Sequence, residues 1–131
     1  LPIYALLWAV AVCMGYTDLH RIPDRMPHEP QLAMMPPRRD YGAMELWEIG
    51  SVNDWGFFGS TIEHEKISIE YMAGAGDAGA DVWVASMTYP DKKFGGVAFS
   101  EEQGSTALIA AMRCYVASKL GDNIELPEEL K

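Results

Sequence analysis

Hydrophobic and polar positions along the chain predict its helices and strands. Residues 1–17 carry no charged side chain, and the apolar run from Ala5 to Met14 predicts a helix covered on most sides. A membrane-spanning helix needs about 20 apolar residues, and a signal peptide needs a basic start. We therefore interpret this run as a core helix, with Gly15 as its stop.

Alternating apolar and polar residues predict three consecutive strands in the second half of the chain. The alternation covers residues 65–71, 81–89 and 94–99. The linkers between them, residues 74–80 and 90–93, are rich in turn-forming residues. Three strands joined by short linkers imply an antiparallel meander.

Residues 105–120 show the clearest helical pattern. Leu108, Met112 and Tyr115 follow one another at a spacing of three to four residues. Ser105 and Thr106 offer side-chain oxygens for the N-cap, and Gly121 follows as the C-terminal stop. We expect an α+β fold, in which this helix and the N-terminal helix pack on one face of a small three-stranded antiparallel meander.

Two stretches of the chain lack a regular pattern. Five of the eight prolines lie within residues 18–44, so we expect a long proline-rich surface loop there, with one short strand at residues 19–22. Residues 50–59 are rich in Gly and Asn, which favour turns, and we expect a structured loop because its aromatic residues need partners. Residues 1–131 are then expected to form a single domain that ends in an acidic tail, residues 122–131.

Composition and charge narrow the classes of function. The chain has 131 residues, 49% of them hydrophobic, which suits one domain with an ordinary core. Ten Lys and Arg stand against nineteen Asp and Glu, and the net charge of −9 argues against direct nucleic-acid binding, which needs clustered cations. Two cysteines, Cys13 and Cys114, are too few for a disulfide framework or a Cys-based zinc site, and we expect both to be buried thiols.

The acidic residues are unevenly distributed along the sequence. Nine of them, and only one basic residue, Lys66, lie between Asp40 and Asp81. These carboxylates either serve solubility or form an acidic face that docks onto a basic surface. Sequence position alone leaves both interpretations open.

Two motifs that suggest chemistry have simpler structural explanations. Residues 74–79 read G-x-G-x-x-G, but a strand follows them instead of the helix that a dinucleotide site requires, so we expect a hairpin loop. His64 lies between Glu63 and Glu65, and adjacent side chains of a strand point to opposite faces. We therefore predict no metal site, no cofactor and no catalytic residue.

The pair Asp54 and Trp55 in the Gly-rich stretch is the most interesting candidate for binding. Asp54 can hydrogen-bond its own backbone in a turn and Trp55 can fill the core, or the two can belong to a binding loop. A pocket between this loop and the last helix, with Asp54, Glu63 and Arg113 as polar groups, would suit a small ligand or a small enzyme. Asp54, Trp55, Glu63 and Arg113 are thus our candidate binding residues.

Three sets of residues are similar to one known family. They are Leu108–Asp122 followed by Leu126–Leu130, then Ala5-Leu6 with Trp8–Ala11, and finally Ser51, Asp54-Trp55, Gly59 and Ile62-Glu63. These segments resemble the NinX-like family of small phage and prophage proteins, which has no assigned activity. The first helix departs from the family pattern, because Leu7 and Val12 stand where polar residues are usual, and the quoted resemblance does not extend to residues 18–44.

The resemblance implies a phage origin and a setting in the bacterial cytoplasm. Our leading hypothesis is a non-enzymatic phage accessory protein that binds a host or phage protein through an acidic surface, without a membrane or nucleic acid as partner. The alternatives are a small-ligand binder or small enzyme at the Asp54–Trp55 loop, and a DNA mimic whose carboxylates are spaced like phosphates. The oligomeric state stays open.

Overall fold

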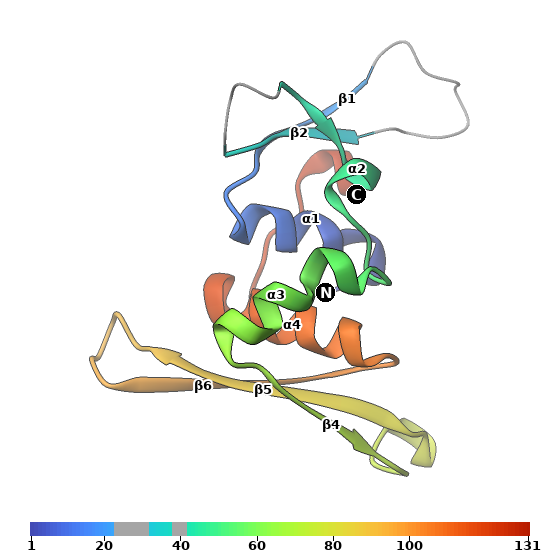
Figure 1. The fold of residues 1–131 in the computed structure, drawn as a ribbon, viewed down its shortest axis with the longest axis vertical. Coiled ribbons are helices and arrows are strands. Elements are labelled where there is room, and N and C mark those ends of the chain that lie inside the picture. Colours follow the sequence, from blue (N-terminus) through green and yellow to red (C-terminus); the bar gives the residue numbers. More distant parts are fainter. Residues whose placement is uncertain (23–31, 38–41) are drawn as a thin grey trace.

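The computed structural model describes residues 1–22, 32–37 and 42–131 (Figure 1). These residues form α-helices and two antiparallel sheets. The helices are α1 (Ile3–Cys13), α2 (Leu46–Ile49), α3 (Trp55–Glu65) and α4 (Ala107–Leu120). The strands are β1 (Thr17–Arg21), β2 (Leu32–Met35), β3 (Met44–Glu45), β4 (Ser68–Met72), β5 (Val82–Pro90) and β6 (Val97–Gly104).

The elements stack in layers, with the larger sheet at one end (Figure 1). Helix α4 contacts all three strands of the sheet β4-β5-β6, and α1 packs on α4. Both helices thus lie on one side of the meander, which confirms the predicted α+β fold, and α1 packs mainly on α4. The smaller sheet β1-β2-β3 lies beyond α1 (Figure 1).

The meander was predicted with its third strand too early in the chain. Strand β6 begins at Val97, not at Phe94, because Gly95 and Gly96 have φ of +75° and +77°, a turn conformation that favours glycine. In the register of β5 with β6, Pro90 pairs with Val97 and Trp83 pairs with Gly104. The hairpin loop predicted for residues 74–79 is confirmed, because β4 and β5 pair directly on either side of it.

The first helix is a core helix, as the sequence predicts. Ala5, Leu6, Ala9 and Val10 are fully buried, and Leu6 and Val10 belong to the same core cluster as Met112 of α4. Full burial of such a side chain contributes about 1.5–3 kcal/mol. Among the described residues, no helix combines the length and the apolar character needed to cross a bilayer.

The expected loop at residues 18–44 contains more regular structure than the sequence suggested. Strand β1 covers most of the one short strand that we predicted, and β2 and β3 pair beside it. Strand β2 buries Ala33 and Met34 to 2% and 1% exposure, and Met34 forms a second core cluster with Ala11 of α1 and Ile49 of α2. Residues 23–31 and 38–41, which hold three of the prolines, lie outside the described residues.

The prediction of an irregular loop at residues 50–59 is wrong for the second half of that stretch, because α3 begins at Trp55. The Asp54 carboxylate accepts a hydrogen bond from the backbone N–H of Phe57 at 3.1 Å and caps the helix. Phe58 is fully buried, and Ile62, one turn later, packs against the same core. The glycines inside α3, which lower intrinsic helix propensity, hid this pattern in the sequence.

The segment after α4 returns across the molecule. Of the two N-cap candidates, Thr106 caps α4 by accepting a hydrogen bond from the N–H of Ile109, and Gly121 ends the helix as predicted. Ile124 then packs against the main core, and a short 3₁₀ turn at Glu128–Leu130 contacts β1. This tail therefore links the larger layer of the molecule to the smaller sheet.

Candidate functional site

Asp54 and Trp55 stand at the start of α3, where the chain leaves a turn. A hydrogen bond from the Asn53 N–H to the Ser51 hydroxyl, at 3.2 Å, stabilises this turn. The Asp54 carboxylate forms the N-cap of the helix. Trp55, the first residue of the helix, remains 54% exposed. Asp54 thus has a structural function in capping, while the indole of Trp55 is left on the surface.

Trp55 lines a shallow hollow of about 300 Å³ at the junction of three elements. The other lining residues are Asn53, Trp83 and residues 105–108. The starts of α3, β5 and α4 meet here, in the region where one alternative from the sequence placed a pocket. Its lining includes two tryptophans, Trp55 and Trp83, and the first turn of α4.

The close approach of β6 to α4 fixes one wall of this hollow. Gly104 ends β6, and a Cβ added there would lie 2.5 Å from the backbone nitrogen of Ala110. Only a glycine lets the strand pass this close to the helix. Residues 105 and 106 consequently follow a tightly determined path from the strand into the helix.

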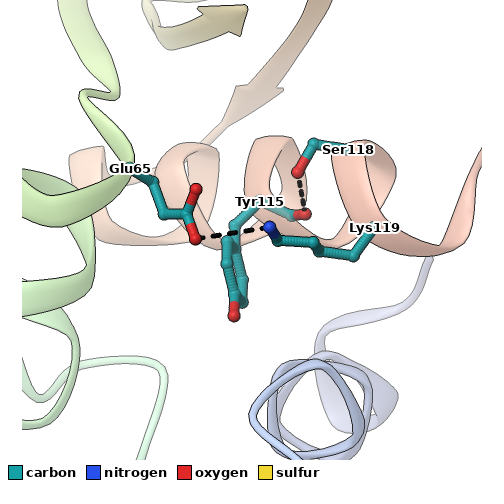
Figure 2. A network of polar contacts seen from close by, with 4 residues as sticks. All are labelled: Glu65, Tyr115, Ser118 and Lys119. Atoms are coloured by element: carbon teal, nitrogen blue, oxygen red, sulfur yellow. Dashed lines mark hydrogen bonds and ion pairs between the residues drawn. The ribbon is translucent and has the colours of Figure 1, made fainter. Parts of the chain in front are cut away.

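The end of α3 is tied to α4, which holds the helix in place (Figure 2). The Lys119 ammonium lies 3.4 Å from the Glu65 carboxylate and 5.8 Å from the centre of the Tyr115 ring. The Phe58 ring packs edge-on against Tyr115, with ring centres 5.5 Å apart. These contacts anchor α3 along its buried side, so Trp55 is presented from a rigid helix.

Glu63 lies at the other end of α3 and does not reach the hollow. Its side chain is exposed, nine residues after Asp54. At a rise of 1.5 Å per residue, the two positions are separated by about 13 Å along the helix. The expectation that Asp54 and Glu63 serve one pocket is therefore corrected by the formation of α3, which holds them apart.

Arg113 also lies away from the hollow, against the edge of β6. Its guanidinium Nη1 donates a hydrogen bond to the Gln103 carbonyl oxygen at 2.9 Å. It lines a second depression of about 220 Å³ together with Glu102 and Asp122. Burial, and secondarily the charge of Asp122, raise the pKa of the Glu102 carboxyl, while Arg113 opposes that shift. Asp54, Glu63 and Arg113 therefore do not converge in a single concave site.

The acidic residues between 40 and 81 that the structure describes are distributed from β3 to the β4–β5 hairpin. Several serve local structure. Asp81 accepts hydrogen bonds from the Tyr71 hydroxyl at 2.7 Å and from the Gly74 N–H at 2.9 Å. Both hydrogen bonds lower the pKa of the Asp81 carboxyl, and the bond from Tyr71 has the larger effect. Together with the cap of Asp54 and the Glu65–Lys119 pair, they show that some of this charge stabilises turns and helix ends.

The two thiols lack the surroundings of a nucleophile. Burial raises the pKa of Cys13 to about 12, although Lys119 opposes it. Burial also raises the pKa of Cys114, whose sulfur lies 3.2 Å from the Ser100 hydroxyl. A reactive thiol needs a lowered pKa and exposure. Cys114 is buried as predicted, and Cys13 is half-buried.

His64 lies in the last turn of α3, not in a strand. The reason we gave against a metal site, the alternation of side chains along a strand, therefore does not apply. Within residues 1–22, 32–37 and 42–131, no three His, Cys, Asp or Glu residues are grouped so that they can hold a metal ion.

Trp83 is the residue of the hollow that sequence reasoning missed. Its position in an alternating strand indicated an inward-facing core residue, and its ring does pack edge-on against Tyr71, with centres 5.2 Å apart. The register that brings Trp83 opposite Gly104, and so beside the start of α4, has no signal in the sequence. The sequence analysis also did not single out Trp47 in α2, which does not line the hollow and is 72% exposed.

A comparison with protein families gives a match over most of the chain. The family model described as Bacteriophage P22, NinX matches residues 4–119. The match spans α1 through nearly all of α4, and so covers every element that builds the hollow. No curated protein matches the chain.

Proposed function

The chain belongs to the bacteriophage P22 NinX family, and from this premise we propose that it is a phage or prophage accessory protein that acts by binding another protein. The exposed indole of Trp55 beside a preformed hollow is the observation that carries the proposal. Tryptophan is enriched among the residues that dominate binding energy at protein interfaces. The proposed setting is the cytoplasm of the bacterial host.

The size and lining of the hollow support a protein partner over a small substrate. Its volume of about 300 Å³ is at the lower end for small-molecule sites. The three polar groups that a small enzyme would have used do not form a site. Asp54 caps a helix, Glu63 is exposed at the other end of that helix, and Arg113 donates a hydrogen bond to the Gln103 carbonyl. A hollow of this size suits one side chain projecting from a partner.

The net charge supports a partner with a basic surface. At −9, the chain attracts basic proteins over distances set by the ionic strength. Complementary charge of this kind speeds association and selects partners more than it adds affinity. We propose a host or phage protein whose basic surface surrounds an apolar side chain that fits beside Trp55.

The proposal is tested by affinity purification from phage-infected cells with three tagged forms of the full chain. Wild type and Trp47→Ala are expected to enrich the same partner, and Trp55→Ala is expected to lose it. Trp47 is the matched control, because it is a more exposed tryptophan on a different helix. Removing an anchor tryptophan costs about 2 kcal/mol or more of binding energy, roughly a 30-fold loss of affinity.

Two outcomes would count against this function. If Trp55→Ala enriches the same proteins as wild type, the hollow is not the anchor. If no protein is enriched to a different extent by wild type and by the two variants, the proposal of partner binding through this surface is wrong. Matching circular dichroism spectra and thermal midpoints of the three forms show that a lost partner reflects the surface and not unfolding.

A further inference from the structure

The tip of the β5–β6 hairpin projects an apolar side chain into solvent. Phe94 is 82% exposed, the highest value among the large hydrophobic side chains that the structure describes. The hairpin extends beyond the helices at the left of the larger sheet (Figure 1). Nothing within the described chain covers this ring except the Lys93 ammonium, 5.5 Å from its centre.

The shape of this tip is fixed before any partner binds. The Asp91 carboxylate accepts hydrogen bonds from the N–H groups of Lys93 and Phe94, at 3.0 and 3.2 Å. The N–H of Asp91 donates to the Gly96 carbonyl at 3.1 Å, which closes the turn. A preorganised loop loses little conformational entropy on docking, so the tip is suited to inserting Phe94 into a recess.

The hollow beside Trp55 lies at the opposite end of the same sheet. Trp83 and Gly104 pair at that end, and Pro90 and Val97 pair at the end that carries the tip. The nine residues of β5 separate the two features by about 30 Å. One molecule therefore carries a projecting aromatic side chain at one end of its sheet and an aromatic-walled recess at the other.

The two features complement each other in size and in charge. The hollow, about 300 Å³, accommodates one side chain, and its indole walls suit an aromatic ring in edge-to-face or offset packing. Lys92 and Lys93 directly precede Phe94, and the Asp91 carboxylate accepts hydrogen bonds within the turn. None of the residues that line the hollow is basic, and the acidic Asp54 stands between the lining residues Asn53 and Trp55, so this surface of a second copy is compatible with two lysines.

We infer that the hollow receives the Phe94 tip of a second copy of this chain. In this inference two copies lie antiparallel and exchange tips reciprocally, an arrangement that the placement of tip and recess at opposite ends of one sheet permits, and the contact closes as a twofold dimer. Each copy then places Phe94 beside the partner's Trp55 and its lysines next to the partner's acidic surface.

This inference goes beyond the proposed function, because it requires only the tip and the hollow. It adds a form of regulation to the same site, since a protein partner that needs Trp55 would have to displace the second copy. Self-association is measured on the purified chain alone, without any other protein. Failure of self-association therefore leaves the affinity-purification result standing, and the reverse is also true.

The test is sedimentation of purified protein over a range of concentrations. Wild type is expected to show a reversible monomer–dimer equilibrium. Phe94→Ser removes the tip and Ser105→Trp fills the hollow, and each is expected to weaken dimerisation about tenfold or more. Trp47→Ser, which removes an exposed aromatic ring elsewhere, is the matched control and is expected to dimerise like wild type.

Mixing the two impaired variants gives the sharpest result. Phe94→Ser keeps an intact hollow and Ser105→Trp keeps an intact tip, so a mixed dimer has one intact contact where either homodimer has none. The equimolar mixture is expected to dimerise at concentrations at which both variants alone are monomeric. A monomeric wild type, an unaffected Phe94→Ser variant or a mixture that stays monomeric would overturn the inference.

Discussion

At the scale of single residues, the two cysteines show how burial controls chemistry. Burial raises the pKa of Cys13 from 9.0 to about 12. Because the thiolate is the reactive form, we expect native Cys13 to react far more slowly with a thiol-labelling reagent at pH 8 than the unfolded chain does. Single Cys13→Ser and Cys114→Ser variants, measured with and without denaturant, assign the rates to each thiol. Fast labelling of Cys13 in the folded protein would contradict this prediction.

The same shift has a consequence for stability against pH. A folded-state pKa above the unfolded value means that the neutral thiol is favoured by the fold. This contribution is fully present below pH 9 and is lost as the pH rises toward 12. Burial also raises the pKa of Tyr115 from 10.0 to about 12, which acts in the same direction. The thermal midpoint is therefore expected to fall between pH 9 and 12, and a constant midpoint there would show that neither shift exists.

At the scale of elements, the contact between β6 and α4 depends on Gly104. A Cβ at this position would meet backbone atoms of Ala110 at 2.5 and 2.9 Å, which cannot rotate away. Gly104→Ala is expected to lower the free energy of unfolding by about 1–3 kcal/mol, the usual cost of overpacking. Urea unfolding followed by circular dichroism measures this loss.

Gly59→Ala is the matched control for that substitution. Gly59 lies inside α3, and a Cβ there would meet nothing within 4 Å. Alanine is the better helix former, so this change is expected to raise the free energy of unfolding by about 0.5–1 kcal/mol. The same chemical change should thus have opposite signs at the two positions, and equal signs would show that the close approach does not decide the effect.

Elements were predicted well where their signals are local. The periodicity of α4 and its cap at Thr106 lie within one segment, and so do the alternations that predict β4 and β5. Helix α3 was missed because its glycines conceal a helix that the burial of Phe58 stabilises. Burial against α4 and the core is a tertiary contribution, which propensity along the chain does not contain.

At the scale of the whole molecule, the tail after α4 connects the two sheets. Ile124 packs against the main core, and the turn at Glu128–Leu130 contacts β1. Deleting residues 122–131 is expected to cost about 1 kcal/mol, given the partial burial of Ile124, and to lower the thermal midpoint by roughly 3–5 °C. Amide exchange in β1 should also become faster.

A shorter deletion separates the two contacts of the tail. Removing residues 128–131 keeps Ile124 in place and removes the contact with β1. We expect this shorter chain to retain the wild-type thermal midpoint within about 2 °C while β1 still exchanges faster. If β1 exchanges at the wild-type rate in both shortened chains, the tail does not support the smaller sheet.

The candidate site shows the limit of reasoning from sequence most clearly. Asp54 and Trp55 were identified from the turn-rich pattern around them, and the structure places Trp55 at a hollow. Glu63 and Arg113 were grouped with them for their chemistry, yet α3 carries Glu63 to its far end and Arg113 bonds to the Gln103 carbonyl. Trp83, the second aromatic wall, came from a strand that the sequence assigned only to the core.

The sequence by itself determined the two apolar helices α1 and α4, the antiparallel meander, a cap at Ser105 or Thr106 and the resemblance to the phage family, because periodicity, capping and motif spacing are local properties of the chain. Only the tertiary structure decided which side chains meet. The approach of β6 to α4 at Gly104 and the anchoring of α3 on Tyr115 place Trp55 beside Trp83. That proximity depends on how the layers pack. Trp55 and Trp83 are 28 positions apart in the sequence, and no local pattern predicts that they lie close together.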